Sequence, residues 1–378
     1  MPAGDTKVDV LVVGDHPCAY FAVALLGLNS QIRIAHLALP EDSCADRPVL
    51  VNPDFFDIHP LAATLRRRIR LQPIYGVDFV TDDRGIVIGH HKRSCVVLAC
   101  RLGEVRREMV RLAKSTRAVF LGRRELNVIG VDETGIHAAA GDMCLRPRAM
   151  IVAAELPQAL RRLLGIHEQW DRGVLHRYTY AELEGSALVA GGSRPVMPMS
   201  LDLGGLLRWA WAIPAGRSVL LAVEQPVETV QQHPPDALLL RWAEVLQRHG
   251  IIRFRRPVSA EGICRMDMPL AGALAHECLG NRTLLIGPAG GFYSACAEDV
   301  YPNCWSAVYA VETVKRALRE KYLQDGLQPY RQTWRTTLGD YLRGPQQNLR
   351  FLLPLVYRNQ AMADRVAQAI LTSRSVVR

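Results

Sequence analysis

The amino-acid sequence predicts an α/β fold in which a three-layer domain with a parallel sheet is interleaved with an antiparallel-sheet domain and followed by a helical tail. Three observations predict it. Residues 7–37 have the pattern of a strand, a turn, an apolar helix and a second strand. Residues 283–320 return to a buried strand, a loop and a long helix. The chain at 170–265, between the two, has the pattern of antiparallel strands. The first domain is therefore interrupted by the second.

Hydrophobic periodicity and turn residues predict the individual elements. The first half of the chain is expected to contain strand 8–13, helix 17–28, strand 32–37, a hairpin at 74–91 with its turn at 82–85, helix 103–115, and strands near 118–121, 127–131, 135–139 and 149–153. The second half is expected to contain strands 173–180, 187–190, 207–213 and 218–223, helix 235–250, strand 283–287 and helices beyond 325.

The order of these elements predicts three regions. The first domain takes residues 1–73, 92–168 and 266–325, and the antiparallel-sheet domain takes residues 74–91 and 169–265. Residues 326–378 form the C-terminal helical segment. A first domain that is completed only after the second one is not the arrangement of a compact dehydrogenase.

The composition is ordinary for a globular protein. Hydrophobic residues make up 49% and charged residues 22% of the 378 positions. The formal net charge is +9, yet no Lys/Arg block is interleaved with aromatic residues, so no nucleic-acid partner is expected. No apolar stretch approaches the length of a membrane span, and residues 1–7 lack the apolar core of a signal peptide.

The nine cysteines lie at irregular spacings without a Cys-x-x-Cys pair. This favours reduced thiols in a cytoplasmic protein over a disulfide framework. His90, His91, Cys95 and Cys100 are close in sequence, but their spacing is not that of metal ligands. We therefore expect core and strand residues at these positions and no metal site.

The segment Gly14-Asp-His-Pro-Cys-Ala19 stands where the dinucleotide fingerprint Gly-x-Gly-x-x-Gly is expected, after a strand and at the start of a helix. Gly14 keeps the glycine of the tight turn, and Ala19 is a mild change at the third position. His16 replaces the glycine over which the backbone approaches a pyrophosphate. Its imidazole is expected to obstruct that approach, and a compensating cation is the alternative. The acid that would bind a ribose is also missing, since His36 or Leu37 stands there.

Two longer segments resemble a known family. Residues 150–166 are similar to a flavoprotein segment with Gly-Ala-Asp-Gly and, four residues later, Arg-Arg; the arginines match as Arg161 and Arg162, but Ala154-Glu155 replaces Asp-Gly. Residues 284–294 resemble a Gly-Asp-Ala-Ala-Gly-Phe loop. The chain is thus similar to FAD-dependent oxidoreductases of the geranylgeranyl-reductase and flavin-dependent-halogenase type. The resemblance implies a Rossmann-like FAD-binding domain, an antiparallel substrate domain, and FAD as the cofactor.

The resemblance places further cofactor positions in the second of these segments. Gly287, Pro288 and Gly290 fall in the loop that holds the flavin side of FAD. Pro288 replaces the aspartate that bonds the ribityl chain in the family, and a proline can neither accept that bond nor donate a backbone one. Glu298-Asp299-Val300 replaces Gly-Glu-Gly, which in the family lets a helix N-terminus approach the flavin. An additional carboxylate there would oppose a reduced anionic flavin.

The motif Trp209-Ala-Trp211-Ala-Ile-Pro214 is intact and matches the Trp-x-Trp-x-Ile-Pro signature of the halogenases. The resemblance implies that Trp209, Trp211 and Pro214 belong to a substrate pocket. Packing of a period-2 strand in a sheet explains the same pattern. The halogenases also need a lysine near the flavin tunnel. Lys92 is the only lysine between the fingerprint and residue 100, and it does not stand at the expected place, so halogenation itself is not expected.

Arg101 opens the helix that begins near residue 103, where these flavoproteins often have an arginine close to the FAD phosphates. A surface arginine at the start of an amphipathic helix is an equally good interpretation. No catalytic residue is assigned from the sequence.

The altered positions lie along the whole length of the expected cofactor. The sequence therefore predicts FAD binding that is weak or absent, and a flavin-weak or flavin-free protein that binds a hydrophobic or aromatic small molecule or a pathway partner protein. The alternative is an active FAD-dependent oxidoreductase on such a substrate. Peripheral membrane contact is a third hypothesis, because the reductases handle prenyl chains and the tail contains Arg343, Arg350, Arg358, Arg365, Arg374 and Arg378.

Overall fold

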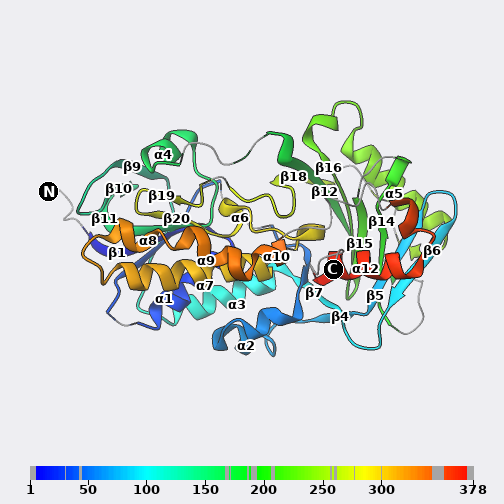
Figure 1. Ribbon diagram of the computed structural model, residues 1–378, viewed down its shortest axis with the longest axis horizontal. Helices are drawn as coiled ribbons and strands as arrows, with labels where there is room; N and C mark the ends of the chain where they lie inside the picture. The colour runs from blue at the N-terminus through cyan, green and yellow to red at the C-terminus, as the bar shows by residue number, and fades with distance from the viewer. Residues whose placement is uncertain are drawn as a thin grey trace.

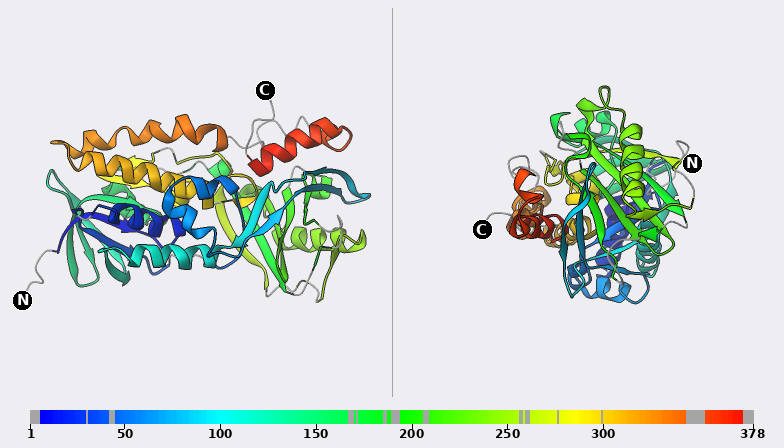
Figure 2. Two further views of the ribbon diagram at one scale, coloured as in Figure 1. Left: turned by 90° about the horizontal axis from the view of Figure 1, so that it is seen from below. Right: turned by 90° about the vertical axis from the view of Figure 1, so that its right-hand side faces the viewer.

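The computed structural model of the chain shows two domains side by side along the long axis of the molecule, with the C-terminal helices running over both (Figures 1 and 2). It describes residues 6–29, 31–41, 45–166, 170, 172–184, 187–188, 194–205, 209–255, 258, 262–275, 277–298, 300–342 and 353–372.

The first domain is built on a parallel sheet with the strand order β20-β11-β1-β2-β8. These strands are β1 (Thr6–Val13), β2 (Ile34–Ala38), β8 (Val119–Arg123), β11 (Met143–Val152) and β20 (Thr283–Leu285). An antiparallel meander adds β9 (Leu126–Val131) and β10 (Ile136–Ala140) to the first part of β11, and β19 (Leu279–Gly280) pairs antiparallel with β20. Segments almost 300 residues apart in sequence thus share one sheet.

Helix α1 (Pro17–Gly27) lies in the centre of this domain. Every residue from Pro17 to Leu26 is buried, which is the pattern of a helix that is apolar on all sides. It packs against α3 (Leu102–Lys114) and α7 (Val300–Ala317), which complete the helical layer (Figure 1). The helical layer, the parallel sheet and the meander make the three layers that the sequence predicts.

The second domain is built on a seven-stranded sheet with the order β18-β12-β16-β15-β14-β5-β6. All neighbours are antiparallel except β14 and β5. The strands are β5 (Gly76–Thr81), β6 (Gly85–His91), β12 (Leu175–Glu184), β14 (Met197–Ser200), β15 (Trp209–Ala215), β16 (Ser218–Pro226) and β18 (Cys264–Pro269). Helix α5 (Pro235–Arg248) covers one face, and β13 (Ala187–Leu188) pairs with β17 (Ile252–Arg253) at its side.

A three-stranded sheet joins the two domains. It contains β3 (Pro48–Val51), β7 (Val97–Arg101) and β4 (Gln72–Ile74), in this spatial order. A 3-10 turn at Pro53–Asp57 and helix α2 (Pro60–Leu65) lie between β3 and β4 in sequence. β3 and β7 also contact β15 of the large antiparallel sheet. The junction is therefore a packed interface and not an open linker.

The C-terminal segment divides between the domains. α8 (Leu323–Leu327), α9 (Tyr330–Thr337) and α10 (Gly339–Leu342) follow the first domain, whereas α12 (Gln360–Thr372) lies on β5 and β6 of the second (Figure 2). Buried residues of α12 join the apolar core of the antiparallel sheet on the face opposite α5. Four arginines of the basic tail lie outside the described residues: Arg343, Arg350, Arg374 and Arg378.

The predicted fold class is confirmed by the sheet topology. Sequence patterns missed several short strands, namely β3, β4, β7, β14 and β18, because three to six residues are too few for a clear periodicity. Within the described part of the chain, no helix is both long and apolar enough to cross a bilayer.

Candidate functional site

The candidate site lies at the carboxyl ends of the parallel strands, the edge at which open α/β sheets bind ligands. A cavity of about 990 Å³ opens there, and we call it the cleft. Its walls come from the turn after β1, the chain after β2 and β11, the start of β9 and helix α6 (Gly287–Gly290), and from β12 and β18 of the second domain. Four buried side chains, His16, Arg47, Tyr180 and Tyr293, and three exposed acids, Glu41, Glu125 and Glu155, are part of its lining.

Gly14 makes the tight turn at the end of β1. Its φ of 130° is rare for a residue with a side chain, and an added Cβ would lie 3.1 Å from backbone atoms of Ala153 and Ala154. Its N–H donates to the carbonyl of Leu37 at 2.9 Å. The first glycine of the fingerprint is therefore required here by the contact between β1, β2 and β11.

His16 caps helix α1. Its Nδ1 accepts a hydrogen bond from the backbone N–H of Cys18 at 3.3 Å and lies 3.0 Å from the Cys18 Sγ. Pro17 is the first residue of the helix and has no N–H, so the first amide of the helix is already bonded to the imidazole. His16 also lines the cleft, and Ala19 one turn later is fully buried in the domain core. The imidazole thus stands at the helix N-terminus that binds a pyrophosphate in dinucleotide folds.

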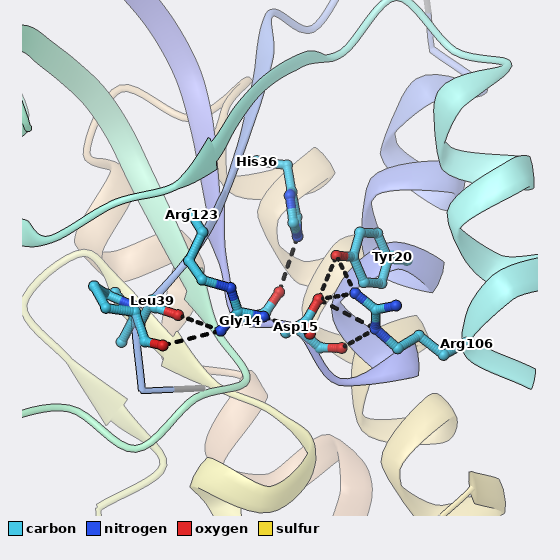
Figure 3. Close-up of polar contacts among 8 residues, drawn as sticks. Gly14, Asp15, Tyr20, His36, Leu39, Arg106 and Arg123 are labelled. Carbon is cyan, nitrogen blue, oxygen red and sulfur yellow. Dashed lines mark hydrogen bonds and ion pairs between the residues drawn. The ribbon is translucent and has the colours of Figure 1, made fainter. Parts of the chain in front are cut away.

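Asp15 is the centre of a buried polar cluster (Figure 3). Its Oδ1 accepts from the Tyr20 hydroxyl at 2.6 Å and from two guanidinium nitrogens of Arg106, and its Oδ2 accepts from Arg123 at 3.0 Å. Arg106 comes from α3 and Arg123 from the end of β8. We call Asp15, Tyr20, Arg106 and Arg123 the Asp15 clamp. Burial and the bond to Asp15 raise the pKa of Tyr20 well above its usual value, so its hydroxyl remains a donor.

The clamp borders the cleft. Arg123 also donates to the carbonyls of Leu39 and Pro40 at 2.9 and 3.1 Å, and both residues line the cleft. Figure 3 shows Arg123 reaching from that side toward Asp15, with Tyr20 and Arg106 on the other side. The clamp therefore connects β8, the chain after β2, and helix α3 around the turn after β1.

His36 stands near the end of β2, close to where dinucleotide folds have their ribose-binding acid. Its Nε2 lies 2.9 Å from the carbonyl oxygen of Gly14. Burial lowers the pKa of His36 to about 4, opposed by this bond. The ring packs between Tyr20 and Phe120, with centroid distances of 4.5 and 5.4 Å. His36 thus takes a structural position, facing the turn rather than a sugar hydroxyl.

Helix α6 contributes the predicted loop positions. Gly287 has a φ of 56°, its N–H donates to Ser306 Oγ at 2.8 Å, and an added Cβ would lie 2.4 Å from Cys18 Sγ. Pro288 lines the cleft beside it, and an added Cβ at Gly290 would contact the Phe292 ring at 2.5 Å. The loop therefore keeps the close packing against α1 that Gly287 permits. The position at which the family has an aspartate is occupied by Pro288.

Glu298 caps the long helix α7. Its Oε1 accepts from the Tyr301 N–H at 2.9 Å, and its Oε2 accepts from Ser294 Oγ at 3.1 Å. The side chain is buried, and Val300 beside it is completely so. Asp299, the central acid of this motif, lies outside the described residues. A carboxylate of the chain itself thus occupies the positive end of the α7 dipole.

The tryptophan motif lies in the core of the second domain. Trp209 and Trp211 share the face of β15 that α12 covers, while Ala210 and Ala212 face α5. The ring of Trp211 stacks on that of Tyr178 with a centroid distance of 5.6 Å, and Tyr178 stacks on Tyr180 with a centroid distance of 5.1 Å. Of these rings, Tyr180 lines the cleft. Trp209, Trp211 and Pro214 are not among the described residues that line the cleft. The stacked rings of Tyr178 and Tyr180 connect Trp211 to the cleft wall.

Arg101 lies elsewhere. Its guanidinium bonds Glu182 at 2.6 and 3.1 Å and Asp46 at 3.1 Å, and the bond to Glu182 raises its pKa above the usual range. It lines a second cavity of about 750 Å³ between β7, β12 and the turn after β15. Arg101 is therefore ion-paired at the second cavity. His16 and Pro288, by contrast, both line the cleft, whereas Gly14 and Gly287 belong to the same two turns but are not part of its lining among the described residues.

Arg47, directly before β3, is one of two arginines among the described residues that line the cleft; the other is Arg265. Arg47 is buried, and its guanidinium lies over the rings of Tyr178 and Tyr180 at 5.6 and 5.9 Å. Sequence reasoning missed Arg47 and all four residues of the Asp15 clamp. One signal was visible: an acid between the first two fingerprint positions, where a phosphate is expected. Its partners lie 91 and 108 residues further along, so no local pattern indicates them.

Solved structures with the same fold include a reductase-like protein, a flavin-dependent brominase and PqsL, which is described as a probable FAD-dependent monooxygenase. A geranylgeranyl bacteriochlorophyll reductase-like protein from Thermoplasma acidophilum has a TM-score of 0.71 and 12% identity, over 99% of this chain and 94% of that one. The flavin-dependent brominase Bmp2 has a TM-score of 0.67 and 15% identity, over 97% and 94%. P. aeruginosa PqsL, solved with 2-aminobenzoylacetate, has a TM-score of 0.66 and 15% identity, over 91% and 97%.

No family model matches the sequence, and no curated protein matches it either. At 12–15% identity the likeness shows the fold alone. The chain therefore has the fold of a geranylgeranyl-reductase-like protein and of a flavin-dependent brominase, which confirms at the level of the fold the resemblance that its motifs indicate.

Proposed function

We propose that this protein is a flavin-weak or flavin-free form of the flavoprotein fold that uses its cleft to bind a hydrophobic or aromatic small molecule. One observation carries the proposal: the helix N-termini expected to approach FAD, and the two arginines beside the turn after β1, are bonded to side chains of the chain itself. His16 bonds the first amide of α1, Asp15 bonds Arg106 and Arg123, and Glu298 bonds the N-terminus of α7.

The phosphate end of the cleft does not fit FAD. A pyrophosphate needs amide donors at a helix N-terminus and close approach of the backbone. The imidazole of His16 takes both the donor and the space. Three exposed carboxylates, Glu41, Glu125 and Glu155, line the same cleft and would repel a diphosphate.

The flavin end does not fit either. Pro288 has no side-chain acceptor for a ribityl hydroxyl. Glu298 brings a buried negative charge to the helix end that would otherwise stabilise a reduced, anionic flavin. Each lost or opposed interaction is worth about 1–3 kcal/mol. Several together correspond to a loss of several decades in affinity, at about 1.4 kcal/mol per decade.

The cleft itself supports a small-molecule ligand. Its volume of about 990 Å³ is at the upper end of ordinary ligand sites, which span about 300–1,000 Å³. Tyr180, Tyr293 and Met266 give it an apolar and aromatic wall. PqsL, which shares the fold, was solved with the aromatic molecule 2-aminobenzoylacetate. A cavity of this size favours a small molecule over the alternative of a partner protein.

Purified protein without added cofactor is expected to lack the visible absorption of a flavin, and titration calorimetry with FAD is expected to give weak or no binding. A ligand screen by thermal shift is expected to find aromatic or apolar compounds that stabilise the protein and lose that effect in Tyr180→Ala. A Kd for FAD of about 1 μM or tighter, which is about 8 kcal/mol of binding free energy, would overturn the proposal.

The second candidate function is an active FAD-dependent oxidoreductase. It is favoured by the retained cleft and by the glycine turn of β1 at Gly14. Tight FAD binding in the same calorimetry would move this candidate to first place. A visible spectrum that bleaches on reduction and returns with a hydrophobic or aromatic substrate would then establish it.

A further inference from the structure

The Asp15 clamp places one negative and two positive side chains beside the end of the cleft that His16, Leu39 and Pro40 line. Asp15 is buried, with 5% of its side chain exposed, whereas Arg106 and Arg123 are 33% and 42% exposed. The carboxylate therefore fills the inner position, and the guanidinium groups lie between it and solvent. Proteins hold a phosphate or a carboxylate in the same way, with arginines that donate several charge-assisted hydrogen bonds to its oxygens.

The clamp lies at the turn where this kind of fold binds the phosphates of a dinucleotide. Asp15 follows Gly14 in the turn between β1 and α1, and the phosphates of a bound dinucleotide lie at this turn in the fold. His16, the next residue, lines the cleft, and so do Leu39 and Pro40, whose carbonyls bind Arg123. Arg123 thus contacts the cleft wall from β8, and both it and Arg106 of α3 donate to an internal carboxylate.

We propose that Asp15 is a specificity-determining residue that substitutes internally for the phosphate anion, so that the natural ligand of the cleft carries no phosphate at this end. The inference rests on the proposed function and deepens it by naming the chemistry of the ligand. With Asp15 in place, one of the two positive charges of Arg106 and Arg123 is balanced by the chain itself, and both guanidinium groups already donate to this internal carboxylate. A phosphate would have to displace a buried carboxylate that accepts hydrogen bonds from both arginines and Tyr20.

The test is the variant Asp15→Asn, which keeps the shape of the side chain and an oxygen acceptor for Tyr20 but removes the charge. The probes are ADP and adenosine, measured by titration calorimetry at low salt. Wild-type protein is expected to bind both weakly. In Asp15→Asn the affinity for ADP is expected to rise at least about tenfold, while that for adenosine stays the same. The gain is expected to fall with added salt, because the arginines are partly exposed.

Asp9→Asn is the matched control. Asp9 lies in the middle of β1 and, like Asp15, is held by an arginine, with Arg33 donating to it at 2.9 and 3.1 Å. Arg33 directly precedes β2, at the edge of the parallel sheet opposite the carboxyl ends where the cleft lies, so the same change of net charge is expected to leave ADP affinity unchanged. Adding Arg123→Gln to Asp15→Asn is expected to remove most of the gain. If Asp15→Asn does not fold, Asp15→Ser supplies the same measurement with a smaller acceptor.

The outcomes separate this inference from the proposed function. An Asp15→Asn or Asp15→Ser protein that folds, by circular dichroism, without gaining ADP affinity overturns the inference, even if wild-type protein still fails to bind FAD. An equal gain in Asp9→Asn also overturns it, because the effect would then be one of net charge. Micromolar ADP binding by wild-type protein overturns it as well. Micromolar FAD binding by wild-type protein overturns both the proposed function and this inference, because the diphosphate of FAD lies at this turn in the fold.

Discussion

His36 and Gly14 are joined across two parallel strands by a hydrogen bond of 2.9 Å between the His36 Nε2 and the Gly14 carbonyl oxygen. A carbonyl only accepts, so Nε2 is the donor. Burial lowers the pKa of His36 to about 4, and the ring is therefore neutral at physiological pH. The bond ties the end of β2 to the turn after β1, where a ribose-binding acid is absent.

This pairing predicts a pH dependence of stability. The pKa of a histidine is about 6.5 in the unfolded chain and about 4 for His36 in the folded one, so the unfolded state binds more protons between these values. Stability is therefore complete above about pH 6.5 and is lost as the pH falls toward 4. The loss at about pH 5 is expected to be about 2 kcal/mol.

Urea denaturation of wild type and His36→Phe at neutral and mildly acidic pH measures this effect. The variant is expected to lose less stability on acidification than wild type. His233→Phe, a histidine on the chain before α5 with no side-chain bond of its own described, is the control and is expected to behave like wild type. Equal losses in wild type and His36→Phe would contradict the assignment.

The double variant His16→Gly and Pro288→Asp is expected to raise FAD affinity measurably, by about tenfold or more. His16→Gly exposes the amide of Cys18 to a pyrophosphate, and Pro288→Asp restores an acceptor on the cleft wall. Calorimetry with FAD is the measurement. The matched control is His59→Gly, because His59 caps α2 in the same way, with Nδ1 accepting from the Leu61 N–H at 3.1 Å, outside the cleft. No gain in the double variant would mean that other groups close the site.

Removing the cap of α7 is expected to destabilise the protein. Glu298→Ala loses a buried acceptor for the Tyr301 N–H and for Ser294, and the free energy of unfolding should fall by about 1–2 kcal/mol. Glu298→Gln, which keeps an acceptor, should lose less. Chemical denaturation is the measurement, with the exposed Glu312→Ala on the same helix as control. A Glu298→Ala protein as stable as wild type would refute the capping role.

Helix α12 is expected to depend on a small hydrogen-bonded cluster around Asp364 for part of its attachment. His90 Nδ1 lies 2.7 Å from the Asp364 carboxylate, and Gln360 donates to the same oxygen and to the Gly89 carbonyl. Asp364→Asn is expected to weaken the helix locally by about 1 kcal/mol. Hydrogen exchange over residues 360–372 should accelerate in this variant but not in Arg365→Gln, an exposed change on the same helix. Unchanged exchange would show that apolar packing alone holds α12.

Local pattern was sufficient for much of the fold. The apolar strand Val8–Val13, the turn at Gly14 and the apolar helix after it follow from residues that are neighbours in sequence. The period-2 spacing of Trp209 and Trp211 likewise predicted two rings on one face of a strand, which the structure confirms. A cap such as Glu298, three residues before the amide it bonds, also lies within the reach of sequence reasoning.

The sequence by itself determined the α/β architecture, its interruption by an antiparallel sheet, and the loss of the glycine and aspartate positions at His16 and Pro288. Only the tertiary structure decided what took their place. Arg101 could have faced the cleft but pairs with Glu182, 81 residues away, while Arg106 and Arg123 converge on Asp15 from a helix and a strand end. The physical reason is that an arginine is long and bonds any carboxylate within reach, so the packing of distant segments selects its partner.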